Sequence, residues 1–271
     1  MKFFACLLGA AVFSTTVIHA NCGLGYCPRR TPTETAPENS VSLRLENTAF
    51  NLDSGSGYYA QILPGYEYSG IHSWIFGGNL PIVALTVHSK TPPNSSKTTP
   101  GISNPLVYAS WYTHLNVNTM LYLGLQLELP LGNFDAGMAG NHVMLVPYAM
   151  MERSMGFGSL TGSVGYCHAF SVGDGGEHPV YVNPHEDQEI LYRVGAGLQQ
   201  LNGALKQRIY LDGRYAVVDE LEGPGRSHVS GGMALDFTPG DRLIFSPSVD
   251  LPFNAPGRFD WRGGLEAKVV F

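Results

Sequence analysis

Hydrophobic and polar residues alternate along most of this chain with a period of two. The pattern is clearest in 259–271, where the odd positions are apolar or Gly and the even ones are mostly charged or Gly. Such alternation predicts β-strands with one apolar and one polar face. Twelve segments follow this pattern: 41–51, 57–68, 71–82, 104–115, 118–130, 141–152, 156–171, 188–201, 205–219, 227–238, 241–251 and 259–271.

The connections between these segments alternate between short and long. Tight turns are predicted near Ser69-Gly70, Asn116-Val117, Arg153-Ser154, Asn202-Gly203 and Pro239-Gly240. The longer connections are 52–56, 83–103, 131–140, 172–187, 220–226 and 252–258. This asymmetry is typical of outer-membrane barrels. We therefore expect an all-β fold, an antiparallel transmembrane β-barrel of about 12 strands, with short periplasmic turns and longer outer loops.

The composition supports a membrane barrel of one domain, residues 41–271. Charged residues make up 14% of the chain, well below the roughly 25% of soluble domains, while hydrophobic residues make up 44%. After the first 20 residues, no segment holds eighteen consecutive apolar residues. The high apolar content therefore does not come from a membrane-spanning helix. The net charge of −6 argues against nucleic acid as a partner.

The N-terminus indicates export. Lys2, an apolar run and a small residue at Ala20 predict a signal peptide over 1–20, cleaved after Ala20. Residues 21–40 are rich in Pro, Thr and Glu and predict a flexible periplasmic lead-in. In an oxidising compartment Cys22 and Cys27 are expected to form a disulfide, with an incomplete metal site or free thiols as alternatives. Asn21 stands where a lipoprotein needs a small residue, so lipidation is not expected.

Strand parity directs a set of charged side chains toward the barrel interior, because a lipid-facing Arg costs about 2–4 kcal/mol at the bilayer midplane. The predicted lumen-lining residues are Arg44, Glu46, Glu128, Arg193, Arg208, Asp212, Arg214, Asp236, Arg242, Asp250, Asp260, Arg262, Glu266 and Lys268. They either line a permeation path or form structural ion pairs that fill a narrow barrel. The pattern alone leaves both interpretations open.

Two features do not fit simple strands. Segment 141–152 is apolar on both parities, which predicts either an apolar inner stripe for a hydrophobic solute or packing against an inward-folded loop or the lead-in. Pro64, Pro81, Pro147 and Pro247 interrupt predicted strands and should fall at bulges or rims, because Pro cannot donate to the ladder.

The connection 172–187 carries His178, His185, Glu177, Glu186 and Asp187. These residues could bind a divalent cation, but such loops are more often simply solvated, so no metal or cofactor is assigned. Cys167 is predicted to be an inert thiol. The chain has no P-loop, zinc motif or Gly-x-Ser-x-Gly.

Residues 104–112 (Asn-Pro-Leu-Val-Tyr-Ala-Ser-Trp-Tyr) and 121–132, a Leu- and Gly-rich strand ending in Leu-Pro-Leu-Gly, resemble a known family. These are the outer-membrane "transporter" proteins named for the meta-pathway of phenol degradation. The resemblance implies a barrel that passes small, often hydrophobic or aromatic, molecules and supplies no catalytic residues. The chain departs from the family in its Cys22/Cys27 lead-in and in its polar connection after Val83.

The terminal strand, which stops on Phe271, resembles the closing strand of bacterial outer-membrane barrels, whose last aromatic residue is read by the assembly machinery. The expected function is therefore that of an outer-membrane channel for small solutes, with membrane lipid, the solute and the barrel assembly machinery as partners. The alternatives are a closed structural barrel and, less favoured, a barrel phospholipase. In the last case Asn141-His142 has no nearby Ser on the same face to complete a nucleophile–base pair.

Overall fold

The computed structural model describes residues 39–52, 55–90, 95–172, 180–185, 187–201, 204–217, 227–240, 242–254 and 259–271. The predicted signal peptide, most of the lead-in and the proposed Cys22–Cys27 disulfide lie outside these residues. So do His178, Glu177, Glu186 and the Asn202-Gly203 turn.

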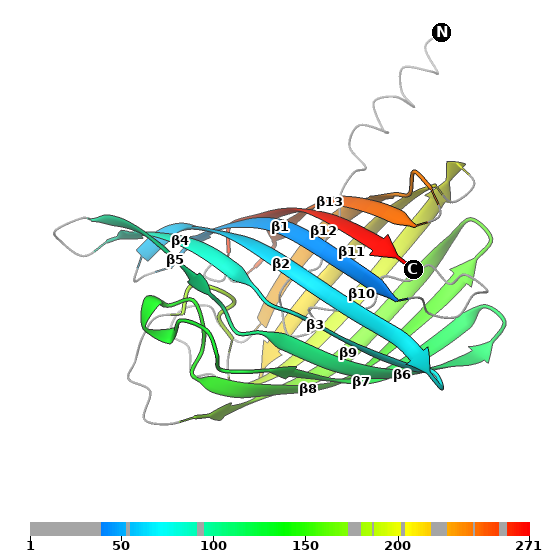
Figure 1. Cartoon of the computed structure of the whole chain (residues 1–271), viewed down its shortest axis with the longest axis horizontal. Coiled ribbons are helices and arrows are strands. Elements are labelled where there is room, and N and C mark those ends of the chain that lie inside the picture. Colours follow the sequence, from blue (N-terminus) through cyan, green and yellow to red (C-terminus); the bar gives the residue numbers. More distant parts are fainter. Residues whose placement is uncertain are drawn as a thin grey trace, which may run out of the picture.

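The described chain forms one antiparallel sheet that closes on itself (Figure 1). Its strands are β1 (Ser40–Asn51), β2 (Gly55–Ile71), β3 (Trp74–Asn79), β4 (Ile82–Ser89), β5 (Ser96–Ile102), β6 (Leu106–Asn116), β7 (Thr119–Glu128), β8 (His142–Met155), β9 (Gly158–Ser171), β10 (Gln188–Gln200), β11 (Leu205–Ala216), β12 (Ser227–Phe237), β13 (Leu243–Pro252) and β14 (Trp261–Val270). A 3-10 helix, η1 (Phe134–Ala136), lies between β7 and β8.

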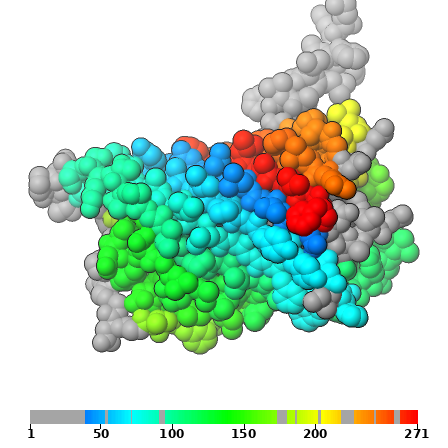
Figure 2. Space-filling view, viewed as in Figure 1, coloured from blue at the N-terminus to red at the C-terminus, as the bar shows by residue number. Residues whose placement is uncertain are grey.

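Two barrel strands are each built from two pieces. β3 and β4 both pair with β2 and together form one barrel strand. β5 and β6 together form the next one, with β5 paired to β4 and β6 paired to β3. β1 pairs with both β2 and β14, which closes the ring. Figure 2 shows the first and last strands side by side on the barrel surface. The prediction of a twelve-stranded antiparallel barrel is confirmed.

The two ends of the barrel differ. Asn39 and Phe271 meet at one end, where the Phe271 N–H donates to the Asn39 carbonyl, and we call this the terminus end. The long connections gather at the opposite end, the loop end. Two turns at the terminus end were predicted three residues too early. His72 and Ser73, both with positive φ, join β2 to β3, and Gly156 and Phe157 join β8 to β9.

The predicted connection 83–103 is largely a β-hairpin, so its assignment as a loop was wrong. β4 pairs with β5 from Ile82–Ile102 to His88–Ser96, and the hairpin extends the wall at the loop end. Val83, Leu85 and Val87 continue the inward parity of β3. Pro81, predicted to interrupt a strand at a bulge or rim, occupies a short break between two collinear pieces, β3 and β4.

The other prolines occur where the ladder tolerates them. Pro64 and Pro147 point outward and are exposed. The β8–β9 ladder skips Val146 and Pro147, and the β12–β13 ladder is interrupted beside Pro247. Each break accommodates the missing N–H, as expected for proline in a sheet.

The outward face is apolar and carries aromatic side chains near both ends. Near the terminus end these are Trp74, Phe76, Phe237, Phe245 and Phe271, and near the loop end Tyr58, Phe170, Tyr215, Phe253 and Trp261. Membrane barrels carry such aromatic girdles on either side of an apolar band. Among the described residues, no helix is both long and apolar enough to span a bilayer.

The barrel interior as the candidate functional site

Strand parity directs nearly all the predicted lumen residues inward. Those that are buried are Arg44, Glu46, Glu128, Arg193, Asp212, Arg214, Asp250, Arg262, Glu266 and Lys268, and Arg208 and Asp236 are half-buried. Arg242 and Asp260 depart from the expectation and are exposed. Arg242 precedes β13 in the turn at the terminus end, and Asp260 precedes β14 at the loop end. A charge at either rim reaches water and needs no buried partner.

Ion pairs join charged residues on adjacent strands. Arg193 of β10 and Asp212 of β11 are direct register partners, with Nη2 of Arg193 2.7 Å from Oδ2 of Asp212. Arg208 and Asp236 pair across β11 and β12 at 2.8 Å. Two-point Arg–carboxylate contacts of the Arg193 kind are geometrically specific, so they hold the side chains in place along the wall.

Other pairs reach across one or two intervening strands. Lys206 Nζ on β11 lies 3.7 Å from Glu152 of β8, beyond both β10 and β9, and its side chain passes over Gly197 of β10. Lys268 Nζ lies 3.5 Å from Glu67 of β2, on the far side of β1. These long side chains lie along the wall, as expected for structural ion pairs in a narrow barrel.

A third group surrounds Glu46 on β1. Its carboxylate accepts hydrogen bonds from Arg44 and Gln61, and Arg262 Nε lies 3.8 Å away. All four residues are buried, so the low local dielectric strengthens this network.

Four inward acidic or basic residues of these networks were not among the predicted lumen residues: Glu67, Glu152, Glu189 and Lys206. Each lies within four residues of a strand end. Their position in the alternating pattern of each strand does predict that they face inward. They were missed because a charged residue near a strand end can equally well belong to a turn or to the rim of the barrel.

Part of the inner wall is apolar. Met144, Val146 and Tyr148 of β8 point inward and cluster with Cys167 of β9 and Leu191 of β10. The predicted inner apolar stripe of 141–152 therefore exists, and it continues onto the two following strands.

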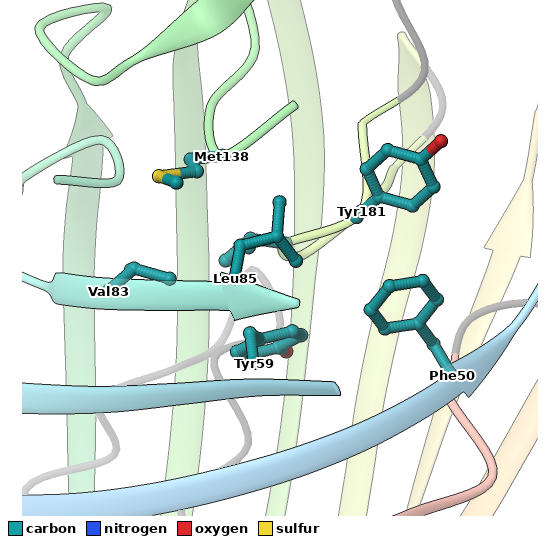
Figure 3. Close-up of a cluster of buried hydrophobic side chains, with 7 residues drawn as sticks. Phe50, Tyr59, Val83, Leu85, Met138 and Tyr181 are labelled. Atoms are coloured by element: carbon teal, nitrogen blue, oxygen red, sulfur yellow. The ribbon is translucent and has the colours of Figure 1, made fainter. Parts of the chain in front are cut away.

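Two connections fold into the loop end of the barrel. Met138, from the β7–β8 connection, and Tyr181 and Val182, from the β9–β10 connection, are buried against wall residues of β1, β2 and β4 (Figure 3). The Tyr181 ring lies 5.2 Å from the Phe50 ring. We call Gly137–Met138 and Tyr181–His185 together the plug. The two connections do fold inward, but their apolar contacts are with β1, β2 and β4, and the packing of 141–152 against such a loop stays a prediction.

Polar contacts also fix the plug. The Tyr181 N–H donates to the Gly137 carbonyl at 2.9 Å, which ties the two connections together. Arg214 of β11 donates to Oδ1 of Asn183 at 3.2 Å and to Glu189 at 3.1 Å. The guanidinium therefore connects the plug to the wall at β10 and β11.

A small cavity of about 30 Å³ lies beside the plug. Its lining includes Arg193, Arg214, Arg262 and two aromatic residues, Tyr59 and Phe259. The Arg262 guanidinium lies over the Phe259 ring, 4.5 Å from its centroid. The space is large enough for about one or two water molecules. Its three guanidinium groups offer donors for an anionic group.

No protein-family model and no curated protein matches the sequence. Solved structures share the fold at low identity. The COG4313 outer membrane channel from Pseudomonas putida F1 is 9% identical with a TM-score of 0.67, and the match covers 91% of this chain and 100% of that one. The transport unit of the autotransporter AIDA-I from Escherichia coli is 11% identical with a TM-score of 0.57, covering 89% and 93%. The NanC porin is 8% identical with a TM-score of 0.54, covering 85% and 98%.

Proposed function

We propose that this chain is a bacterial outer-membrane channel for small solutes, with a preference for small aromatic or hydrophobic molecules that carry an acidic group. The observation that carries the proposal is a closed barrel with an apolar outer face, whose interior combines arginines and aromatic rings beside a folded-in plug. The fold likeness to a solved outer-membrane channel supports it.

The outer face supports the location. Alternate residues such as Leu123, Leu125 and Leu211 are exposed and apolar. In water this surface would be an aggregation hazard, whereas in a bilayer it is solvated by lipid. Membrane lipid and, through the exposed Phe271 at the terminus end, the barrel assembly machinery are the proposed partners. Membership of the family named for the phenol meta-pathway is part of the same proposal.

The interior supports the solute class. The cavity lining brings together Arg193, Arg214 and Arg262, each of which also contacts a wall carboxylate: Asp212, Glu189 and Glu46, respectively. A carboxylate solute would be attracted electrostatically, and the adjacent Tyr59 and Phe259 rings would contact its apolar part. A neutral sugar would lack the charge–charge attraction to the arginines.

Solute flux into liposomes tests the proposal. A small aromatic acid should enter faster than a sugar of similar size, and Arg262→Gln should reduce that ratio while leaving sugar entry largely unchanged. Faster sugar entry in the unaltered protein would contradict the proposed solute class. His168→Ala, on the outward face of β9, is the matched control and should leave both rates unchanged.

A closed structural barrel is the second candidate, because the plug and the wall ion pairs also describe a filled interior. Single-channel recording separates the two candidates. A barrel that gives no conductance steps and excludes both solutes is structural.

A further inference from the structure

Three potential metal ligands meet at the loop end. Glu128 is the last residue of β7, His142 is the first of β8, and His185 lies in the plug. One ligand atom from each can be chosen so that all lie within 4.8 Å of one another. Residues far apart in the sequence thus converge on one point between the barrel wall and the plug.

The carboxylate is held in position by a neighbouring amide. Asn104 Nδ2 donates to Oε1 of Glu128 and to the Gly140 carbonyl, both at 3.0 Å. Its Oδ1 accepts from the Gly132 N–H at 3.0 Å, so both ends of the amide are fixed. In metal sites, neighbouring groups hydrogen-bond to the ligands and orient them in the same way.

The two imidazoles lie edge to face, with ring centroids 4.2 Å apart. Within the described residues, Nε2 of His142 is buried and has no hydrogen-bond partner. The ring occupies space left by Gly140, where an added Cβ would come within 1.9 Å of the His142 Cε1. The glycine therefore permits this placement of His142.

We propose that Glu128, His142 and His185 bind one divalent transition-metal ion of the zinc class. Two imidazoles and a carboxylate are a donor set that favours zinc and its neighbours over calcium or magnesium. A buried carboxylate needs compensating charge. Asn104 supplies a neutral hydrogen bond, and Arg214, which acts on Glu128 through space, is itself bound to Glu189 and Asn183.

The distances require only side-chain adjustment. Tetrahedral zinc with bonds of about 2.0–2.1 Å holds its ligand atoms about 3.3 Å apart. The separations between ligand atoms would therefore shorten by at most about 1.5 Å from their 4.8 Å limit. The fourth position is left to water.

Metal binding here would clamp the plug to the wall. Glu128 and His142 belong to barrel strands, whereas His185 follows Tyr181 and Val182, which fill the loop end. The bound ion would thus stabilise the closed arrangement. This consequence for flux rests on the proposed channel function, but the binding itself does not.

Zinc titration of the full-length refolded barrel in detergent, after chelator treatment, tests the site. We expect one ion per chain, with binding abolished in His185→Ala and His142→Ala and strongly weakened in the isosteric Glu128→Gln. Asn104→Ala should weaken affinity about 10–100-fold, as for other residues that orient ligands. The outward-facing His168→Ala should bind as the unaltered protein does.

Folding of each variant is checked by the altered gel mobility of an unheated barrel. Folded Glu128→Gln and His185→Ala that bind zinc as tightly as the unaltered protein, or no binding by the unaltered protein at millimolar zinc, would overturn the proposal. Amide hydrogen exchange of residues 180–185 is the second measurement. Zinc should slow exchange there in the unaltered protein and leave His185→Ala unchanged, and an identical response in both would overturn the clamp. Neither measurement requires the barrel to conduct, so a failure of the channel proposal is recognised separately.

Discussion

At the scale of single residues, glycine positions decide how large side chains lie in the barrel. Three inward tyrosines are direct register partners of glycines on the neighbouring strand: Gly77–Tyr108, Gly124–Tyr148 and Gly232–Tyr210. In each case the tyrosine ring covers the space that a Cβ would take. The ring therefore lies along the wall instead of across the lumen. This is the known pairing of aromatic residues with strand glycines.

Gly124→Ala tests this role. Its Cβ would lie 2.3 Å from Cζ of Tyr148, so the ring must swing toward the lumen. We expect a stability loss of about 1–3 kcal/mol in urea unfolding, the usual cost of overpacking, together with lower conductance. Gly156→Ala is the matched control, because nothing lies within 4 Å of its added Cβ. In the double variant with Tyr148→Ala, conductance should return; if it stays low, the ring is not the cause.

At the scale of elements, periodicity predicted the strands well and their ends poorly. In β1 the alternation from Ser40 to Phe50 is almost perfect, because one face meets the apolar exterior and the other the charged interior. Turns were misplaced where Gly or Ser lies within a strand, as at Ser69-Gly70, where the β2–β3 ladder skips both residues and resumes at Ile71. A Gly inside a strand often marks such a bulge, so it does not by itself indicate the turn.

The contribution of an ion pair between strands to barrel stability can be tested by substitution. Asp212→Ala leaves the buried Arg193 guanidinium without its two-point partner, and we expect a loss of about 3–5 kcal/mol in unfolding free energy. Replacing both residues by apolar ones of similar size, Arg193→Met with Asp212→Leu, should cost much less. An equal loss in the single and double variants would mean that the pair is not the relevant interaction. Urea unfolding followed by tryptophan fluorescence measures both.

At the scale of the whole molecule, the interior could be predicted only in part. Parity directed Arg44, Asp212 and Lys268 inward because a lipid-facing charge is costly. The plug gave no such signal. Met138 and Tyr181 lie in irregular connections without periodicity, and only the closed barrel brings them against β1, β2 and β4. The meeting of Glu128, His142 and His185 depends on the same long-range folding, so the spacing of the histidines in the sequence could not reveal it.

Destabilising the plug tests whether it limits passage through the barrel. Tyr181→Ala removes a buried ring that packs on Phe50, and truncation of a buried aromatic side chain costs about 3–5 kcal/mol. The backbone contact to Gly137 and the Arg214 contacts are too few to hold the segment against that loss. We expect larger single-channel conductance and faster sugar entry, with the barrel still folded because its wall is unchanged. Tyr58→Ala removes an equal ring from the outward face of β2 and should leave conductance unaltered. If the two variants conduct alike, the plug does not limit passage.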